Sequence, residues 1–282
     1  MSAWPTVRVA TVIPARMASS RFPGKPLLEV RGLPMIEHVR RRALLCRRFS
    51  EETVATCDEE IAAVVRGYGG KVVMTSPAHP AATDRVAEAA RSIDCTHVVN
   101  VQGDEILVLP ADLEKMVQAM EKSPHVPAWN AVAPIERSSE LGDRSVVKCA
   151  LSRSGRILFC ARDFSLLGTQ CPIPTAGPDT ARHNPSASDL HGTQRFEPVH
   201  MILGILGYRR DFLERYGALP RTPLEVAESI DQSRILEHDA EMRSVPFSKG
   251  YIGINEQREV DVVGACLHSD PRQQEILRQV LV

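Results

Sequence analysis

Three cationic side chains in one short loop are the first feature of this chain that suggests chemistry. Arg16, Arg21 and Lys25 are separated by small residues and by the pair Pro23-Gly24. A nucleoside triphosphate carries about four negative charges that need charge-assisted contacts of this kind. Small residues let backbone N–H groups approach phosphate oxygens, and a following helix adds donors. The loop predicts a triphosphate site; the alternative is a basic surface loop.

A carboxylate that follows a predicted buried strand is the second candidate. Asp104 lies in the turn Gln102-Gly103-Asp104-Glu105, directly after the apolar run 97–101. Carboxylate and phosphate oxygens together form the usual environment of Mg²⁺. The turn therefore predicts Asp104 as a magnesium ligand, and the alternative is a turn aspartate without a ligand. Glu105 either supports this site or is merely solvated.

The motif Thr83-Asp84-Arg85 opens a predicted helix. Thr83 and Asp84 suit the cap of that helix. A cation is disfavoured at a helix N-terminus, so Arg85 indicates an anion nearby. An exposed surface arginine explains the pattern almost as well.

A capping box at 222–225 begins another predicted helix, which should run to about His238. Glu225, Glu228 and Gln232 are spaced to share one face of it. That face either contacts a polar ligand or is simply solvated.

Hydrophobic periodicity predicts the elements that must position these residues. The first half of the chain alternates strands at 7–13, 53–56, 71–74 and 97–101 with helices at 34–45, after Asp58, at 83–93 and at 110–120. The second half is mixed, with strands at 131–135, 146–151, 156–161, 201–206, 242–247 and 251–254, a helix at 211–216 and a helical tail. The polar stretch 168–199 reads as a long loop or arm.

The alternation predicts an α/β fold with a doubly wound, mostly parallel sheet. Such sheets bind ligands at the carboxyl ends of their strands. The loop from Arg16 to Lys25 and the turn from Gln102 to Glu105 both follow strands at such ends. This placement supports a shared ligand site independently of any family resemblance.

Bulk composition excludes several classes of protein. The chain has 282 residues, 43% of them apolar, and a formal net charge of −1, which does not favour a nucleic-acid or anionic-membrane partner. No apolar run approaches the roughly 20 residues of a membrane span, and the N-terminus lacks a signal-peptide pattern. The seven cysteines include no C-x-x-C pair, which favours free thiols in a reducing cytosol. We therefore expect a cytoplasmic protein.

The cationic loop resembles that of the CMP-Kdo synthetases, the 3-deoxy-manno-octulosonate (Kdo) cytidylyltransferases, which read roughly I-P-A-R-x-x-S-T-R-x-P-G-K-P. It is not a Walker A motif. The resemblance extends to about residue 260 through the segments 32–36, 83–85, 100–105 and 203–208. It implies a single Rossmann-like nucleotidyltransferase domain over 1–282, with a smaller mixed sub-region at about 130–210 for sugar binding and dimerisation.

The resemblance also implies roles for particular residues. The catalytic residues would be Arg16, Lys25 and Asp104, and the metal ligands Asp104 and Asn255. The nucleotide would contact Pro14, Ala15, Arg16, Ser20, Arg21, Lys25, Thr83, Arg85, Gln102 and Gly103, and the acceptor would contact Arg85, Arg162, Tyr208, Glu228 and Gln232. The chain departs from the family pattern at Ile202, where the family has a sugar-contacting histidine, and at Asn255, where it has a second metal-binding aspartate.

The implied activity is transfer of CMP from CTP to the anomeric hydroxyl of a Kdo-like acidic sugar, a step of lipopolysaccharide biosynthesis. The reaction would use Mg²⁺, release pyrophosphate and proceed by in-line attack on the α-phosphorus in a homodimeric enzyme. One alternative is a cytidylyltransferase of the same fold with another acceptor, such as an amino-Kdo-like sugar, another ulosonic acid or a phosphonate. The other is a non-catalytic CTP- or CMP-binding protein with a decayed metal site.

Overall fold

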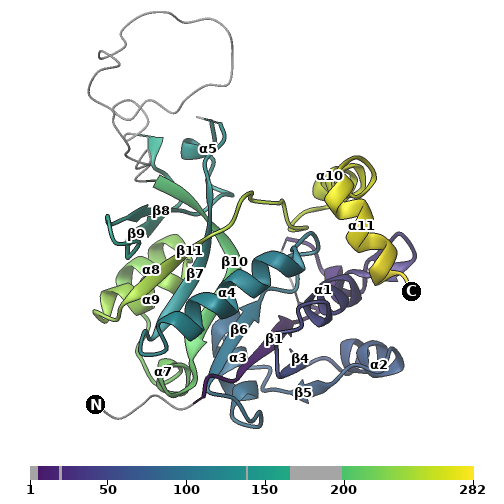
Figure 1. Cartoon of the computed structure of the whole chain (residues 1–282), viewed down its shortest axis with the longest axis horizontal. Helices are drawn as coiled ribbons and strands as arrows, with labels where there is room; N and C mark the ends of the chain where they lie inside the picture. Colours follow the sequence, from purple (N-terminus) through teal and green to yellow (C-terminus); the bar gives the residue numbers. More distant parts are fainter. Residues whose placement is uncertain (1–5, 19–20, 138, 166–198) are drawn as a thin grey trace, which may run out of the picture.

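One sheet runs through the molecule in a computed structural model that describes residues 6–18, 21–137, 139–165 and 199–282 (Figure 1). Within these residues the sheet has nine strands, with the order β11-β7-β10-β6-β1-β4-β5 and β8–β9 attached to β10. The bounds are β1 Val9–Ala15, β4 Glu51–Thr56, β5 Val72–Met74, β6 His97–Val101, β7 Ala128–Pro134, β8 Lys148–Leu151, β9 Ile157–Ala161, β10 Val199–Arg209 and β11 Met242–Pro246. Strand β10 runs antiparallel between β6 and β7, whereas β6, β1, β4 and β5 are parallel.

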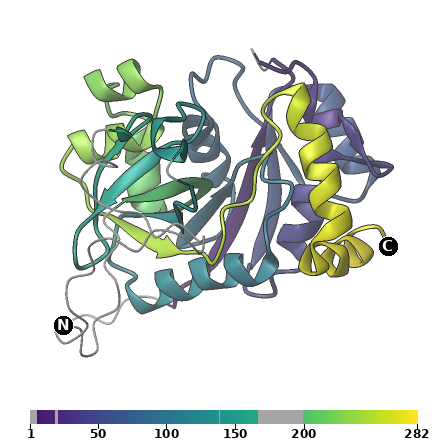
Figure 2. The ribbon, with the colours of Figure 1, turned by 90° about the horizontal axis from the view of Figure 1, so that it is seen from above.

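Helices cover both faces of this sheet, as a doubly wound fold requires (Figure 2). One face packs against α1 Met35–Leu44, α2 Glu59–Gly67 and α4 Pro110–Lys122. The other packs against α3 Ala82–Ala90, α7 Arg210–Tyr216 and α9 Asp231–Glu237. The C-terminal pair, α10 Gln257–Ser269 and α11 Pro271–Val280, packs beside α1. Two short strands, β2 Glu29–Val30 and β3 Leu33–Pro34, and the turn η1 Lys25–Leu27 complete the first crossover.

Local sequence explains why the central strands are buried on both faces. In β1, Val9 and Ile13 enter the core under α1, while Ala10 and Val12 enter the core under α3. Near-continuous apolar runs of this kind are typical of parallel strands covered by helices. The predicted α/β fold with a mostly parallel sheet is confirmed.

Two predicted elements of the second half are wrong. The segment from Tyr251 to Ile254 forms no strand and crosses the Asp104 turn instead, where Ile254 N donates to Asp104 O at 3.3 Å. The helix after Thr222 does not continue to His238, because Ser229 adopts a left-handed conformation with φ 53° and ends α8 Pro223–Glu228 before α9 begins. Glu225, Glu228 and Gln232 therefore do not share one helical face. Nearly all of the predicted 168–199 loop lies outside the described residues. Among the described residues, no helix is long and apolar enough to span a membrane.

Folding stability should depend on pH through His38 of α1. The imidazole is fully buried and donates from Nε2 to the Val30 carbonyl at 2.6 Å. Burial lowers the pKa of His38 from 6.5 to about 4, so the unfolded chain binds this proton first as pH falls. Stability from this group is present above pH 6.5 and is lost towards pH 4, by about 2 kcal/mol between pH 7 and 5.

Urea unfolding of His38→Gln should show a flatter dependence between pH 7 and 5, since the amide keeps a donor for Val30. His268→Gln, on an exposed part of α10, is the control and should follow the wild type. A His38→Gln curve parallel to the wild type would contradict the assignment.

Candidate active site

The cationic loop and the Asp104 turn meet at the carboxyl ends of β1 and β6. β1 and β6 are neighbouring parallel strands. The strands that follow β1 in the chain, β4 and β5, lie on one side of this pair, and the strands that follow β6 lie on the other side. This edge of the sheet is therefore a topological switch point. A cleft of about 230 Å³ opens there. From the predicted nucleotide set it is lined by Pro14, Ala15, Arg16, Arg21, Lys25, Arg85, Gln102 and Gly103, and Asp104 joins them. Ser20 lies outside the described residues.

Glycines allow the loops around the cleft to approach one another. A Cβ on Gly103 would lie 2.9 Å from the Pro14 carbonyl oxygen, and one on Gly253 would lie 2.8 Å from the Asp104 carbonyl oxygen. Real Cβ contacts of this length are essentially absent from proteins. The two glycines therefore let the segment before Asn255 and the end of β1 close around the Asp104 turn.

Asp58 anchors the cationic loop. Its position before α2 is that of the predicted cap residue, but its carboxylate makes no capping bond and accepts from Met17 N at 2.8 Å instead. The loop then returns on itself, since Gly24 N donates to Met17 O at 3.0 Å and Gly24 has φ 75°. The charge of Asp58 thus holds the backbone that carries Arg16 and Arg21.

Lys25 joins the loop to the Asp104 turn. Its Nζ lies 2.7 Å from Asp104 Oδ2 and donates to the Ile254 carbonyl at 3.1 Å. Arg21 Nη2 donates to Asn255 Oδ1 at 3.1 Å. Both predicted metal ligands therefore contact cationic side chains of the loop. Three segments that are far apart in sequence meet at this point.

The oxygens of Asp104 and Asn255 suit a divalent cation that arrives with phosphate groups. Among the described residues, no group of three His, Cys, Asp or Glu side chains could hold a metal alone. Mg²⁺ is usually bound by one or two carboxylates together with substrate phosphates and water. One carboxylate and one amide oxygen beside a cationic cleft fit this pattern.

Glu105 supports the turn from behind. Its Oε1 accepts from Gly204 N of β10 at 2.7 Å, and Gln102 N donates to Gly204 O at 2.9 Å. Burial raises the pKa of Glu105 to about 7, and the neighbouring Asp104 charge adds to the shift. A Cβ on Gly204 would lie 2.6 Å from this carboxylate oxygen. Of the two predicted roles for Glu105, the structure favours support of the site.

Arg85 is buried and lines the cleft, with Nη1 donating to Thr75 Oγ1 at 2.6 Å. It is not an exposed surface arginine. Thr83 is directed elsewhere, since its hydroxyl donates to Asp231 Oδ2 at 3.1 Å and lies 3.4 Å from the Tyr208 hydroxyl. Neither Thr83 nor the fully buried Tyr208 lines the cleft. The predicted cap roles of Thr83 and Asp84 are wrong, because Ala81 occupies the cap position of α3.

The other predicted acceptor residues separate into two groups. Arg162 N donates to Glu228 Oε2 at 3.0 Å, and Arg162 Nε donates to the Glu228 carbonyl at 2.6 Å. Burial lowers the pKa of Arg162, and the nearby positive charge of Arg21 lowers it further. Gln232, by contrast, is buried and donates from Nε2 to Asn130 Oδ1 at 2.8 Å.

Sequence reasoning missed several residues of the site. His79, Pro26 and Met35 also line the cleft. His79 contacts Glu88 of α3, and the only sequence signal for it was its place just before the 83–85 motif. No spacing pattern indicated that Asp58 would anchor the loop.

A cationic cleft at the switch point of a mostly parallel sheet defines the class of α/β nucleotide-binding proteins. The chain matches the cytidylyltransferase family over residues 10–243. The 3-deoxy-manno-octulosonate cytidylyltransferase of Geobacter metallireducens is 35% identical over 91% of this chain and 96% of its own length. That of Myxococcus xanthus is 38% identical over 93% of this chain and 97% of its own length. A solved CMP:2-keto-3-deoxy-manno-octonic acid synthetase complexed with CTP is 31% identical, with a TM-score of 0.78 over 93% of this chain and 99% of that one.

This chain belongs to the cytidylyltransferase family and, within it, to the 3-deoxy-manno-octulosonate cytidylyltransferases.

Proposed function

We propose that this protein transfers CMP from CTP to the anomeric hydroxyl of Kdo or a closely related acidic sugar, with release of pyrophosphate. The observation that carries the proposal is the meeting of Arg16, Arg21 and Lys25 with Asp104 in one cleft. The names of the relatives supply the nucleotide and the acceptor. A triphosphate neutralises this set of cations, and Gln102 and Gly103 at the end of β6 border the space beside it.

The residues act through position and charge. A bond forms between the sugar oxygen and the α-phosphorus while the bond from that phosphorus to the pyrophosphate oxygen breaks, and the hydroxyl proton leaves to solvent. Negative charge develops on the leaving pyrophosphate, where preorganised cations contribute most. Arg16, Arg21 and Lys25 hold those oxygens, and the anchored loop keeps the cations in place before the nucleotide binds.

Asp104 and Asn255 are the residues that would hold Mg²⁺ with the triphosphate. The ion, when bound, supplies charge neutralisation at the α-phosphate. Lys25 pairs with Asp104 in the free protein, and we expect its ammonium to turn to the phosphates as the nucleotide enters. The Asp104 carboxylate would then face a positive charge both without nucleotide, from Lys25, and with nucleotide, from the metal ion.

The acceptor side is formed by Arg162 and Glu228 beside Arg21. Arg162 also donates from Nη1 to the Arg144 carbonyl at 2.9 Å, which fixes its guanidinium at the end of β9. A positively charged edge of this kind suits the carboxylate of a sugar acid. The proposal also includes a cytoplasmic homodimer, as the family resemblance implies.

Ile202 favours a second candidate within the same chemistry, a cytidylyltransferase whose preferred acceptor differs from Kdo. It lies on β10, close in sequence to Gly204, and its side chain packs partly buried against the apolar cluster under α3, α7 and α9. An apolar side chain where relatives present an imidazole leaves a sugar hydroxyl without a partner. That costs about 1–3 kcal/mol, or one to two orders of magnitude in specificity.

Pyrophosphate release with CTP, Mg²⁺ and a panel of acids tests both candidates. We expect turnover with Kdo to be slower than with a related acid, and Ile202→His to raise kcat/KM for Kdo by about tenfold. Ile202→Leu changes shape without adding a donor and should leave the ranking of acceptors unchanged.

Ordinary efficiency with Kdo, unchanged by Ile202→His, would show that Ile202 is tolerated. CTP binding without pyrophosphate release for any acceptor would favour the non-catalytic alternative.

A further inference from the structure

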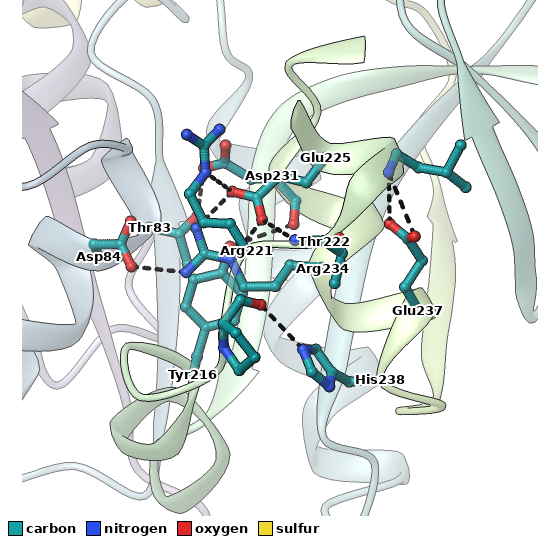
Figure 3. Close-up of polar contacts among 12 residues, drawn as sticks. Thr83, Asp84, Tyr216, Arg221, Thr222, Glu225, Asp231, Arg234, Glu237 and His238 are labelled. Atoms are coloured by element: carbon teal, nitrogen blue, oxygen red, sulfur yellow. Dashed lines mark hydrogen bonds and ion pairs between the residues drawn. The ribbon is translucent and has the colours of Figure 1, made fainter. Parts of the chain in front are cut away.

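Two adjacent residues of α3 hold two residues of α9, as the close-up shows (Figure 3). Thr83 Oγ1 donates to Asp231 Oδ2 at 3.1 Å. Arg234 Nη1 donates to Asp84 Oδ1 at 3.0 Å, and both side chains of this ion pair are buried. Asp84 and Arg234 are 150 positions apart in the sequence, so these contacts join distant segments of the chain.

Arg234 is itself fixed from the side of α8. Its Nε and Nη2 donate to the two carboxylate oxygens of Glu225, at 2.8 and 2.5 Å. Its guanidinium lies over the Tyr216 ring, 4.4 Å from the centroid. A planar guanidinium held at both edges and on one face has a single orientation. Arg234 therefore links α3, α7, α8 and α9.

The residues that form this link on α3 and on α9 are sequence neighbours of residues predicted for the site. Arg85 follows Asp84 and lines the nucleotide cleft. Gln232 follows Asp231, and Glu228 at the end of α8 contacts Arg162. The link therefore connects the element that carries the nucleotide side with the elements that carry the acceptor side.

Helix α3 does not need this link to stay on the sheet. Its apolar residues Val86, Ala87, Ala89 and Ala90 are buried in the core under that face. The short helix α8 has less apolar surface there, since its residues Leu224 and Val226 are exposed. Loss of the link should therefore shift the acceptor side and leave the cleft in place.

The pair is also poorly optimised for stability. Asp84 Oδ2 is buried and has no hydrogen-bond partner among the described residues. A buried ion pair with an unsatisfied oxygen contributes less to stability than well-packed apolar residues of the same volume. Geometric positioning accounts better for its presence.

We propose that the Asp84–Arg234 pair is a positioning pair that sets the acceptor-binding helices α8 and α9 at the correct distance from the nucleotide cleft. This inference rests on the proposed function for its catalytic readout. Neither residue lines the nucleotide cleft; both act through Arg85 on one side and through Glu228 on the other.

Asp84→Ala should raise the KM for the acceptor by about tenfold, the size of effect that loss of one charge-assisted hydrogen bond gives, and leave the Kd for CTP within about twofold. Asp84→Asn keeps an oxygen that accepts from Arg234 and should give an intermediate KM. It also carries the test if Asp84→Ala does not fold. The acceptor KM comes from pyrophosphate release, and the CTP Kd comes from calorimetry, both well below the Tm of each variant.

Arg221→Gln is the matched control. Arg221 donates from Nε to Glu225 Oε1 at 3.0 Å, so it contacts the same carboxylate as Arg234, but its link ends on α8. This variant should match the wild type in acceptor KM and in CTP Kd.

A lower Tm with an unchanged acceptor KM in both Asp84 variants would show a purely structural role and overturn the proposal. Equal loss of CTP affinity would overturn its assignment to the acceptor side. A wild type without transfer would contradict the proposed function alone. Hydrogen exchange then decides: faster exchange at 223–237 in Asp84→Ala than in Arg221→Gln supports the positioning pair, and equal exchange overturns it.

Discussion

Asp104→Asn is expected to lower kcat for CMP transfer by at least about a thousandfold, with the protein still folded. The side chain ends in the cleft and contacts Lys25 Nζ at 2.7 Å, so its charge belongs to the site rather than to the core. In the proposed role of Asp104 as a metal ligand, loss of its carboxylate removes several kcal/mol of transition-state stabilisation, and about 1.4 kcal/mol is tenfold in rate. Initial rates of pyrophosphate release at saturating CTP and Mg²⁺ measure the effect.

Asp94→Asn is the control, because Asp94 also pairs with a basic residue, Arg8, but lies outside the cleft. It should retain the wild-type rate. The two variants also differ in CTP binding without metal: Asp104→Asn should bind CTP as tightly as the wild type or more tightly, since a negative charge beside the triphosphate is gone. Near-normal turnover of Asp104→Asn would remove Asp104 from the metal site.

Lys25→Met should raise the Kd for CTP by about tenfold or more. The substitution keeps the length of the side chain and removes the ammonium, which we expect to turn from Asp104 to the phosphates. Loss of one hydrogen bond to a charged group costs about 1.5–3 kcal/mol, which corresponds to about 10- to 150-fold in affinity. Arg16→Ala should weaken binding in the same direction. Calorimetric titration with CTP and Mg²⁺ measures both constants.

Lys115→Met is the matched control for Lys25→Met. Lys115 Nζ lies 2.7 Å from Asp112 Oδ1, so it forms a lysine–aspartate pair of the same length, but it lies on α4 outside the cleft. Its loss should leave CTP affinity unchanged. Unchanged affinity in both Lys25→Met and Arg16→Ala would show that this loop does not bind the triphosphate.

Elements with a strong local signal could be predicted well. The strand 97–101 was predicted with its observed bounds, and the helix at 110–120 differs from α4 by two residues at its end. Both rest on an uninterrupted apolar pattern and on Pro110 at the first helical position, which act within one element. The end of α8 gave no such signal: Ser229, which is neither glycine nor asparagine, adopts the left-handed conformation that ends the helix.

The amino-acid sequence by itself determined the α/β alternation, the cationic loop and the placement of Asp104 at a strand end, because periodicity and turn chemistry depend on neighbouring residues. The tertiary structure alone decided that Asn255 and Ile254 reach the loop, that Asp58 anchors it, and that Thr83 and Asp84 face α9 instead of capping α3. These contacts join residues between about 40 and 235 positions apart, as 41 separate Met17 from Asp58 and 234 separate Arg21 from Asn255. No local pattern encodes such pairings, since they arise only when the sheet order and the crossing of the C-terminal segment bring distant side chains within hydrogen-bond reach.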